Sequence, residues 1–198
     1  MPKYRTQVMA ELARELEFAP LAWRRQHIDR AEQLYWQLDA DRNYPFDYIT
    51  YRITGVRSDE GEGTTLVGEA IQRDLLTLVE RISETINEPV DVYDPTPWDL
   101  RTICTRLGVT SKTISRYRRQ GLFARRLIWP GGRKKLSFLP DSVERFKQVR
   151  TPRQQRAAEF SRIDEPTQHA IITRARRITS RVDVSPFRVA SYLSGKYK

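Results

Sequence analysis

The sequence predicts a mainly α-helical fold with one short β-hairpin, divided between an acidic and a basic half. Apolar residues recur at helical spacing through most of the chain, most regularly over Leu66–Ile86. Alternating apolar residues flank a turn at Pro130-Gly131-Gly132. Residues 1–100 carry 11 Lys and Arg against 19 Asp and Glu, whereas residues 101–198 carry 24 against 6. This change of sign predicts two halves with different roles and a polyanionic partner for the second.

The composition indicates a globular protein without a membrane segment. A chain of 198 residues is long enough for one or two modest domains. No apolar run approaches the 18 or more residues of a membrane helix, and residues 1–16 mix Arg and Glu with Leu, unlike a signal peptide. The single cysteine, Cys104, cannot form an internal disulfide. We therefore expect a cytoplasmic protein with no membrane partner.

Residues 1–90 are expected to form an acidic α-helical domain. Apolar spacing predicts helices over Pro2–Glu17 and Pro20–Leu38. A third helix is expected to begin at Pro45, which suits a first helical turn, and to end at Gly55. After a polar loop, a continuous apolar stripe predicts a long helix over Leu66–Ile86.

A linker is expected between the two halves. Residues 87–97 contain three prolines and three acidic residues, and we place the linker itself at residues 91–97. The acidic domain then either serves independent protein contacts only, or docks electrostatically on the basic half and competes with DNA for it. The sequence leaves both arrangements open.

A helix, a tight turn and a second helix are predicted after this linker. Thr96-Pro97 combines a capping residue with a proline suited to the first helical position. The apolar residues at 100, 103, 104 and 107 share one helical face, and Gly108 permits the turn. Thr110 or Ser111 then caps a second helix over Lys112–Gln120. This order of elements is the signature of a helix-turn-helix.

The second of these helices sorts its residues by face. Ile114 and Tyr117, or in its place the aliphatic stem of Arg118, are spaced to pack inward. A recognition helix needs short hydroxyls and Arg near its N-terminal end, because these groups meet base edges and phosphates. An ordinary surface helix is the alternative. The outward residues, which are candidate DNA contacts, are Lys112, Thr113, Ser115, Arg116 and Arg119.

A strongly basic hairpin is predicted next. Strands over Leu122–Trp129 and Arg133–Leu139 flank the Pro-Gly-Gly turn, and a helix from Pro140 follows. These elements predict a winged helix-turn-helix domain over residues 98–149. Such a wing would lie along the phosphate backbone or in a minor groove, unless it is simply a solvated tip. Its candidate DNA contacts are Arg125, Arg126, Arg133, Lys134 and Lys135.

Residues 150–198 are expected to form a basic helical segment after a break near Val149–Pro152. Glu165-Pro166 and Ser185-Pro186 each predict the start of a helix. Two helices with this spacing are either the first elements of a second, truncated helix-turn-helix or a simple helical hairpin.

The segment over residues 110–122, with the basic hairpin, resembles MerR-like and excisionase-like winged helix-turn-helix domains. More narrowly, the chain resembles the amino-terminal part of the large, divergent sigma factors of planctomycete bacteria. The resemblance is carried by residues 24–32 (RRQHIDRAE), 44–55 (YPFDYITYRITG), 109–116 (VTSKTISR) and 132–139 (GRKKLSFL). It implies a part in transcription initiation with RNA polymerase as partner. No segment matches the polymerase-binding and promoter-melting regions of sigma factors, so we interpret the chain as a sigma-factor-like protein or its N-terminal fragment.

These observations together predict a sequence-specific, nucleoid-associated protein that binds double-stranded DNA. An excisionase-like architectural protein, which would bend DNA without touching polymerase, is the alternative. RNA binding is a less well supported hypothesis. It would need aromatic side chains that stack on bases, but Phe123, Trp129 and Phe138 are spaced like the core of the hairpin. The only histidines, His27 and His169, lie far apart, and one cysteine gives no metal-ligand spacing. We expect no enzyme activity, metal, cofactor or small-molecule substrate.

Overall fold

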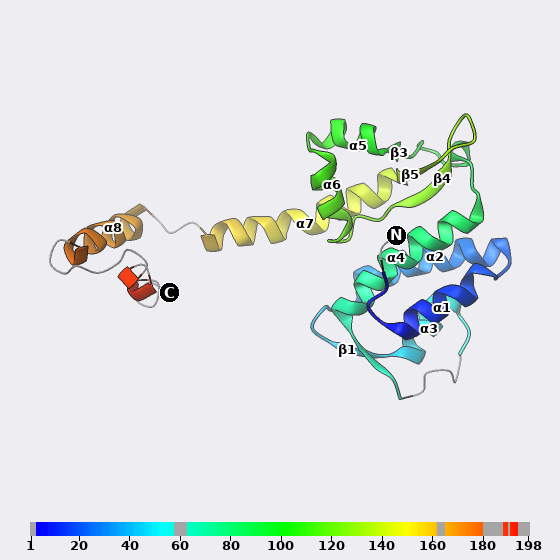
Figure 1. Cartoon of the computed structure of the whole chain (residues 1–198), viewed down its shortest axis with the longest axis horizontal. Coiled ribbons are helices and arrows are strands. Elements are labelled where there is room, and N and C mark those ends of the chain that lie inside the picture. The colour runs from blue at the N-terminus through cyan, green and yellow to red at the C-terminus, as the bar shows by residue number, and fades with distance from the viewer. Residues whose placement is uncertain (1–2, 58–62, 162–164, 180–187, 190, 194–198) are drawn as a thin grey trace. The chain divides into compact units, whose positions relative to one another are not determined.

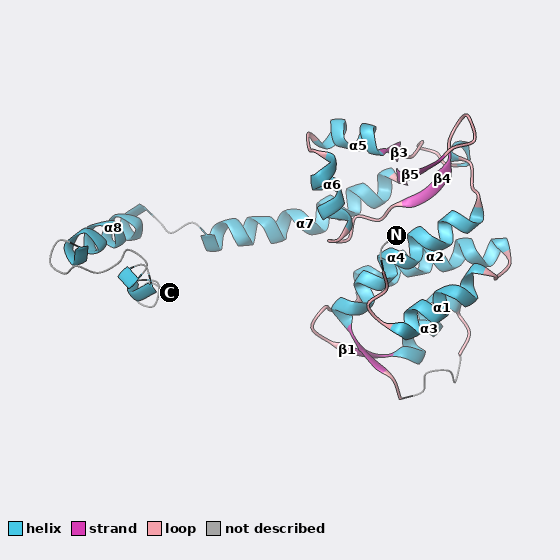
Figure 2. Cartoon of the chain, in the orientation of Figure 1, coloured by secondary structure: helices cyan, strands magenta, loops and turns pink. Residues whose placement is uncertain are grey.

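Figure 1 shows a computed structural model of the chain, which describes residues 3–57, 63–161, 165–179, 188–189 and 191–193. The described residues are mainly helical, with two small antiparallel sheets (Figure 2). The chain divides into two compact units, Met1–Gln148 and Val149–Lys198. The acidic half and residues 101–148, which include the hairpin, therefore lie in the same unit.

Four helices of the acidic half share one apolar core. They are α1 (Gln7–Glu17), α2 (Leu21–Gln37), α3 (Phe46–Thr54) and α4 (Gly68–Ile86). The predicted stripe on α4 is confirmed, because its apolar residues from Ile71 to Ile82 are almost all fully buried. Each such side chain contributes about 1.5–3 kcal/mol of burial free energy.

A two-stranded sheet links the segments before α3 and before α4, where the sequence predicts a loop and a start of the long helix at Leu66. Strand β1 (Asn43–Pro45) pairs antiparallel with β2 (Thr65–Val67). Helix α4 then begins at Gly68, whose N–H donates to the Arg42 carbonyl at 2.7 Å. A Cβ at Gly68 would lie 2.0 Å from the Asp39 carbonyl oxygen, so the close approach of these two backbones requires glycine.

Residues 87–99 pack against the fold rather than forming a free linker. A 3₁₀ turn covers Val90–Val92, with Val90 buried, and the Ile128 N–H donates to the Glu88 carbonyl at 2.8 Å. Strand β3 (Trp98–Asp99) follows. The predicted cap at Thr96 is wrong: the next helix begins at Leu100, and the Asp99 carboxylate accepts the Thr102 N–H at 2.9 Å.

Residues 100–148 of the first unit contribute to a second, smaller apolar core. Helices α5 (Leu100–Leu107) and α6 (Ser111–Arg118) precede strands β4 (Arg125–Ile128) and β5 (Lys134–Phe138), and the sheet has the order β3-β5-β4. The buried members of this core are Ile103, Ile114, Leu122, Ala124, Phe138, Val143 and Phe146. Trp36 of α2 packs against both cores and so connects the two halves.

Helix α7 (Pro140–Ser161) begins at the expected proline but continues through the break predicted near Val149–Pro152. The break is predicted from Pro152, because a proline inside a helix removes one backbone hydrogen bond. A proline often marks the end of a helix but does not always do so. Helix α8 (Glu165–Thr179) begins where the sequence predicts. The helix start predicted at Ser185-Pro186 lies outside the described residues. The second helix-turn-helix therefore stays a prediction.

Candidate nucleic-acid interface

Helix α6 is held by capping at its start and by apolar contacts on one face. Gly108 ends α5 in the left-handed conformation, at φ 63°, and the Val109 N–H donates to the Cys104 carbonyl at 3.0 Å. Thr110 caps α6 by accepting the Thr113 N–H. Ile114 is fully buried, as its spacing predicts. These contacts fix which face of α6 is turned outward.

The outward face of α6 carries the residues that the sequence assigns to DNA. Lys112, Ser115, Arg116 and Arg119 are exposed, whereas Thr113 is half-buried and takes part in the cap. The Ser115 hydroxyl donates to the Ser111 carbonyl at 3.0 Å, which leaves its oxygen lone pairs available as acceptors. A basic and hydroxyl-bearing strip thus covers this side of the helix.

The tip of the hairpin is also basic and exposed. Gly131 and Gly132 adopt positive φ, and the Gly132 N–H donates to the Trp129 carbonyl, which confirms the predicted turn. Arg133, Lys134 and Lys135 are all exposed. The Lys134 ammonium group donates to the Glu84 carbonyl at 2.8 Å. The tip therefore presents three cations, one of which also fastens it to α4.

Arg125 is buried, whereas the sequence predicts that it is exposed on the hairpin as a DNA contact. Only 8% of the residue is exposed, and its guanidinium donates to Glu32 at 2.9 Å and to Asp29 at 2.8 Å. Burial acts to lower the pKa of Arg125, but the carboxylate of Glu32 and its neighbours outweigh this and raise it above the usual value. Because its donors are used within the protein, Arg125 is not available to contact DNA, and this part of the prediction is wrong.

Arg126 is likewise engaged within the protein. Its guanidinium donates to Glu80 of α4 at 2.9 and 3.1 Å, and its backbone N–H donates to the Ser83 hydroxyl at 2.8 Å. Arg118 of α6 pairs with the same Glu80 carboxylate. The acidic half thus docks on the basic half through specific arginines of β4 and α6. The two halves are therefore in direct contact, whereas competition between the acidic half and DNA stays a prediction.

The hairpin aromatics do not form a platform for stacked bases. Phe123 and Phe138 are buried in the two cores. The Trp129 indole N–H donates to the Ser137 hydroxyl at 2.8 Å, and its ring faces the Lys135 ammonium group. The expectation that these aromatics are core residues is therefore confirmed for the two phenylalanines.

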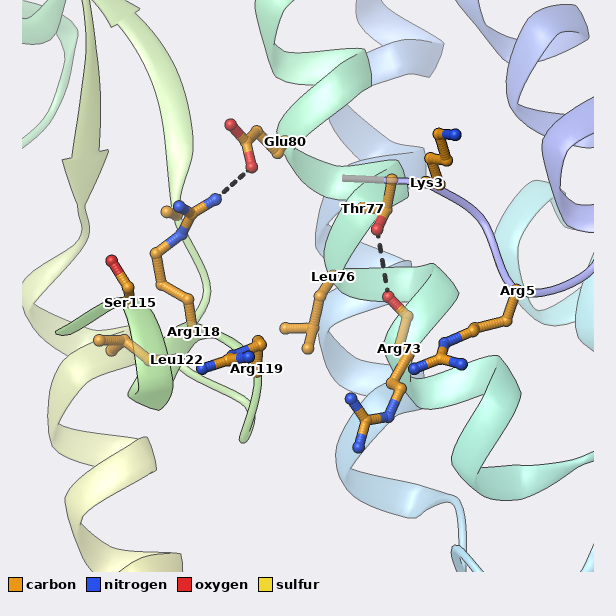
Figure 3. Close-up of a pocket in the computed structure, with 11 residues that line it drawn as sticks. Lys3, Arg5, Arg73, Leu76, Thr77, Glu80, Ser115, Arg118, Arg119 and Leu122 are labelled. Carbon is orange, nitrogen blue, oxygen red and sulfur yellow. Dashed lines mark hydrogen bonds and ion pairs between the residues drawn. The ribbon is translucent and has the colours of Figure 1, made fainter. Parts of the chain in front are cut away.

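A cleft beside α6 contains cations that sequence reasoning missed. Its volume is about 370 Å³, and it lies between α4 and the N-terminal segment on one side and α6 on the other (Figure 3). Its charged lining residues are Lys3, Arg5, Arg73, Glu80, Arg118 and Arg119. No local pattern predicts this group, because residues 3 and 5 reach α6 only through the tertiary fold.

Comparisons with known proteins found no match among protein-family models, curated proteins or solved structures. In the part of the chain that the structure describes, no helix is both long and apolar enough to cross a membrane. The same residues bring together no group of three or more His, Cys, Asp or Glu side chains that could hold a metal ion.

Proposed function

We propose that the protein binds double-stranded DNA sequence-specifically, with α5, α6 and the β4–β5 hairpin acting as a winged helix-turn-helix. The observation that carries this proposal is the division of α6 into two faces. Ile114 anchors one face in the core, while Lys112, Ser115 and Arg116 are exposed on the other. Arg and Lys donate to guanine edges, and serine accepts from or donates to several bases, so this face suits the major groove.

The hairpin tip supplies the second part of the proposed interface. Arg133, Lys134 and Lys135 are cations on a short two-stranded projection, and such groups bind phosphates without reading sequence. Arg125 and Arg126 take no part, because both are paired with carboxylates of the acidic half. The proposed DNA contacts are therefore Lys112, Thr113, Ser115, Arg116, Arg119, Arg133, Lys134 and Lys135.

We further infer a role in transcription initiation or its regulation, with RNA polymerase as the second partner. The support for this narrower role is the sequence resemblance to planctomycete sigma factors over segments on both sides of residue 100. Co-purification of the full chain with RNA polymerase tests it directly. Duplex binding without any polymerase association would favour the architectural alternative of excisionase type.

Equilibrium binding tests the broader proposal. The full chain is titrated with a library of randomised duplexes, and the enriched duplex is compared with random duplex and with single-stranded RNA of the same length. We expect tight binding to the enriched duplex, with affinity that falls steeply as salt rises, because neutralised phosphates release counterions. Equal affinity for RNA and duplex DNA, or a flat salt dependence, would overturn the proposal.

A further inference from the structure

The cleft beside α6 joins basic residues from distant parts of the sequence. Lys3 and Arg5 come from the segment before α1, Arg73 comes from α4, and Arg119 follows α6. Figure 3 shows these side chains around the same space, with Ser115 and Arg118 on the α6 side. Three of these cations belong to the half of the chain that is acidic overall, so their gathering at this point is not a consequence of composition.

A buried carboxylate fixes the N-terminal segment in this place. Asp74 of α4 is fully buried and accepts the backbone N–H groups of Arg5 and Thr6 at 2.6 and 3.0 Å. The Thr6 hydroxyl donates to the same carboxylate at 2.7 Å. A carboxylate that accepts three hydrogen bonds is a strong local anchor. The side chains of Lys3 and Arg5 are left exposed beside the cleft.

Positive charge is in excess in the cleft. Its lining has five cations and one carboxylate, Glu80, which is occupied by Arg118 and Arg126. Arg73 pairs with Glu69 at 3.0 Å. Within the described residues, Lys3, Arg5 and Arg119 form no ion pair. Like charges held close together repel, and an anion bound between them would relieve that repulsion.

We propose that this cleft binds backbone phosphates of the DNA duplex on one flank of α6, with Lys3, Arg5 and Arg73 as the added contacts. The inference rests on the proposed DNA-binding function and extends it to the N-terminal half. Ser115 and Arg119 belong both to the cleft lining and to the outward face of α6. A duplex seated on that face would bring its flanking phosphates to the mouth of the cleft, where such contacts set orientation and affinity rather than sequence choice.

The test compares two charge-matched double variants of the full chain. Arg5→Gln with Arg73→Gln removes two cations of the cleft, whereas Arg14→Gln with Arg57→Gln removes two exposed cations that do not line it. Each lost phosphate contact lowers the slope of log affinity against log salt by about 0.9, so the cleft variant should show a slope smaller by about 2. Its preference between the enriched and random duplex should not change. The control should keep the wild-type slope, and circular dichroism should show that all three chains are folded.

Three results would overturn the inference in distinguishable ways. If the wild type binds duplex DNA with sequence preference and both double variants share its slope, the cleft assignment fails and the proposed function stands. If the wild type binds no duplex, both fail. A third arm measures the melting temperature with inorganic pyrophosphate added. Pyrophosphate could raise the melting temperature of the wild type but not of the cleft variant, while both chains bind duplex DNA with the same affinity. The cleft would then bind a small anion and not DNA phosphates, which would also overturn the proposal.

Discussion

At the scale of single residues, the proposed interface separates side chains that read bases from those that bind phosphates. Arg116 lies on the exposed face of α6, whereas Arg133 lies at the hairpin tip. Arg116→Ala should cost about 1–3 kcal/mol of binding free energy and relax preference at one base position. Arg133→Ala should weaken binding to enriched and random duplexes equally. Competition binding with single-base variants of the enriched duplex measures both effects, and an equal loss on all sequences for Arg116→Ala would contradict its role.

Arg125 illustrates an arginine whose role is structural. Its guanidinium is buried against Glu32, which is itself only 14% exposed in its side chain. Arg125→Met should lower the free energy of unfolding by about 3 kcal/mol, because it leaves the Glu32 carboxylate buried without its partner. Urea denaturation measures this loss. Arg133→Met is the matched control, and a surface substitution of this kind should stay within about 0.5 kcal/mol of the wild type. Equal midpoints for the two variants would show that the Arg125 ion pairs are not stabilising.

His27 gives the acidic half a pH dependence of stability. It is 3% exposed, its Nδ1 atom has no hydrogen-bond partner, and burial, followed by the nearby Arg30, lowers its pKa. The unfolded chain binds a proton at this residue below a pH of about 6.5, while the folded chain resists it. Stability should therefore fall as pH decreases from 6.5 toward the lowered pKa of the folded state. His27→Gln should remove this part of the acid dependence in thermal melts between pH 8 and pH 5, and an unchanged dependence would rule out His27 as its source.

At the scale of elements, local sequence predicts most helices and the turns that separate them. Gly108, Thr110 and the Pro-Gly-Gly turn carry their signals within a few residues, and each lies where the pattern indicates. The pairing of β1 with β2 was missed, because three-residue strands that pair about 20 residues apart show too short a pattern to detect. The sequence predicts the cap at Thr96 instead of Asp99, because both are good capping residues and only tertiary contacts distinguish them.

Two glycines at element ends provide a graded test of the turn geometry. Gly108 has φ 63° with nothing within 4 Å of a built Cβ, so Gly108→Ala should cost about 1–2 kcal/mol from backbone conformation alone. Gly121 has φ 111°, and its Cβ would lie 2.6 Å from the Tyr35 hydroxyl. Gly121→Ala should therefore destabilise the protein more than Gly108→Ala in denaturant melts. The reverse order would contradict the packing of α2 against the chain that follows α6.

At the scale of the whole molecule, the fold differs most from the expectation of separate acidic and basic domains. Residues 1–148 form one compact unit, in which Arg118, Arg125 and Arg126 bind carboxylates contributed by α2 and α4. The sign change in charge makes docking one of the two arrangements that the sequence leaves open. It could not predict which arginines are used, because their partners lie from 38 to 96 residues away in sequence. The basic cleft beside α6 is not predictable from the sequence for the same reason, because its lining residues are far apart in the chain.

This organisation predicts that the basic half does not fold alone. A fragment of residues 95–198 would lose the carboxylates of Arg125 and the apolar core that covers Phe123. We expect it to show no cooperative thermal transition, whereas residues 1–148 should melt cooperatively. Scanning calorimetry of the two fragments beside the full chain measures this. A cooperative transition of the 95–198 fragment at the temperature of the full chain would show that the two halves are independent domains.

Reading of duplex DNA by the exposed face of α6 is the proposal on which the others depend. The most direct test is the ratio of affinities for an enriched duplex and a random duplex, measured at one salt concentration for the wild type and for the triple variant Lys112→Ala, Ser115→Ala, Arg116→Ala. Specific sites typically bind at least about 10³-fold more tightly than random DNA, so the wild type should show a ratio of that order. The variant should remain folded, keep weak binding to random duplex through its hairpin, and show a ratio near one. A ratio near one in the wild type, or an unchanged ratio in the variant, would show that this face of α6 does not read the base sequence.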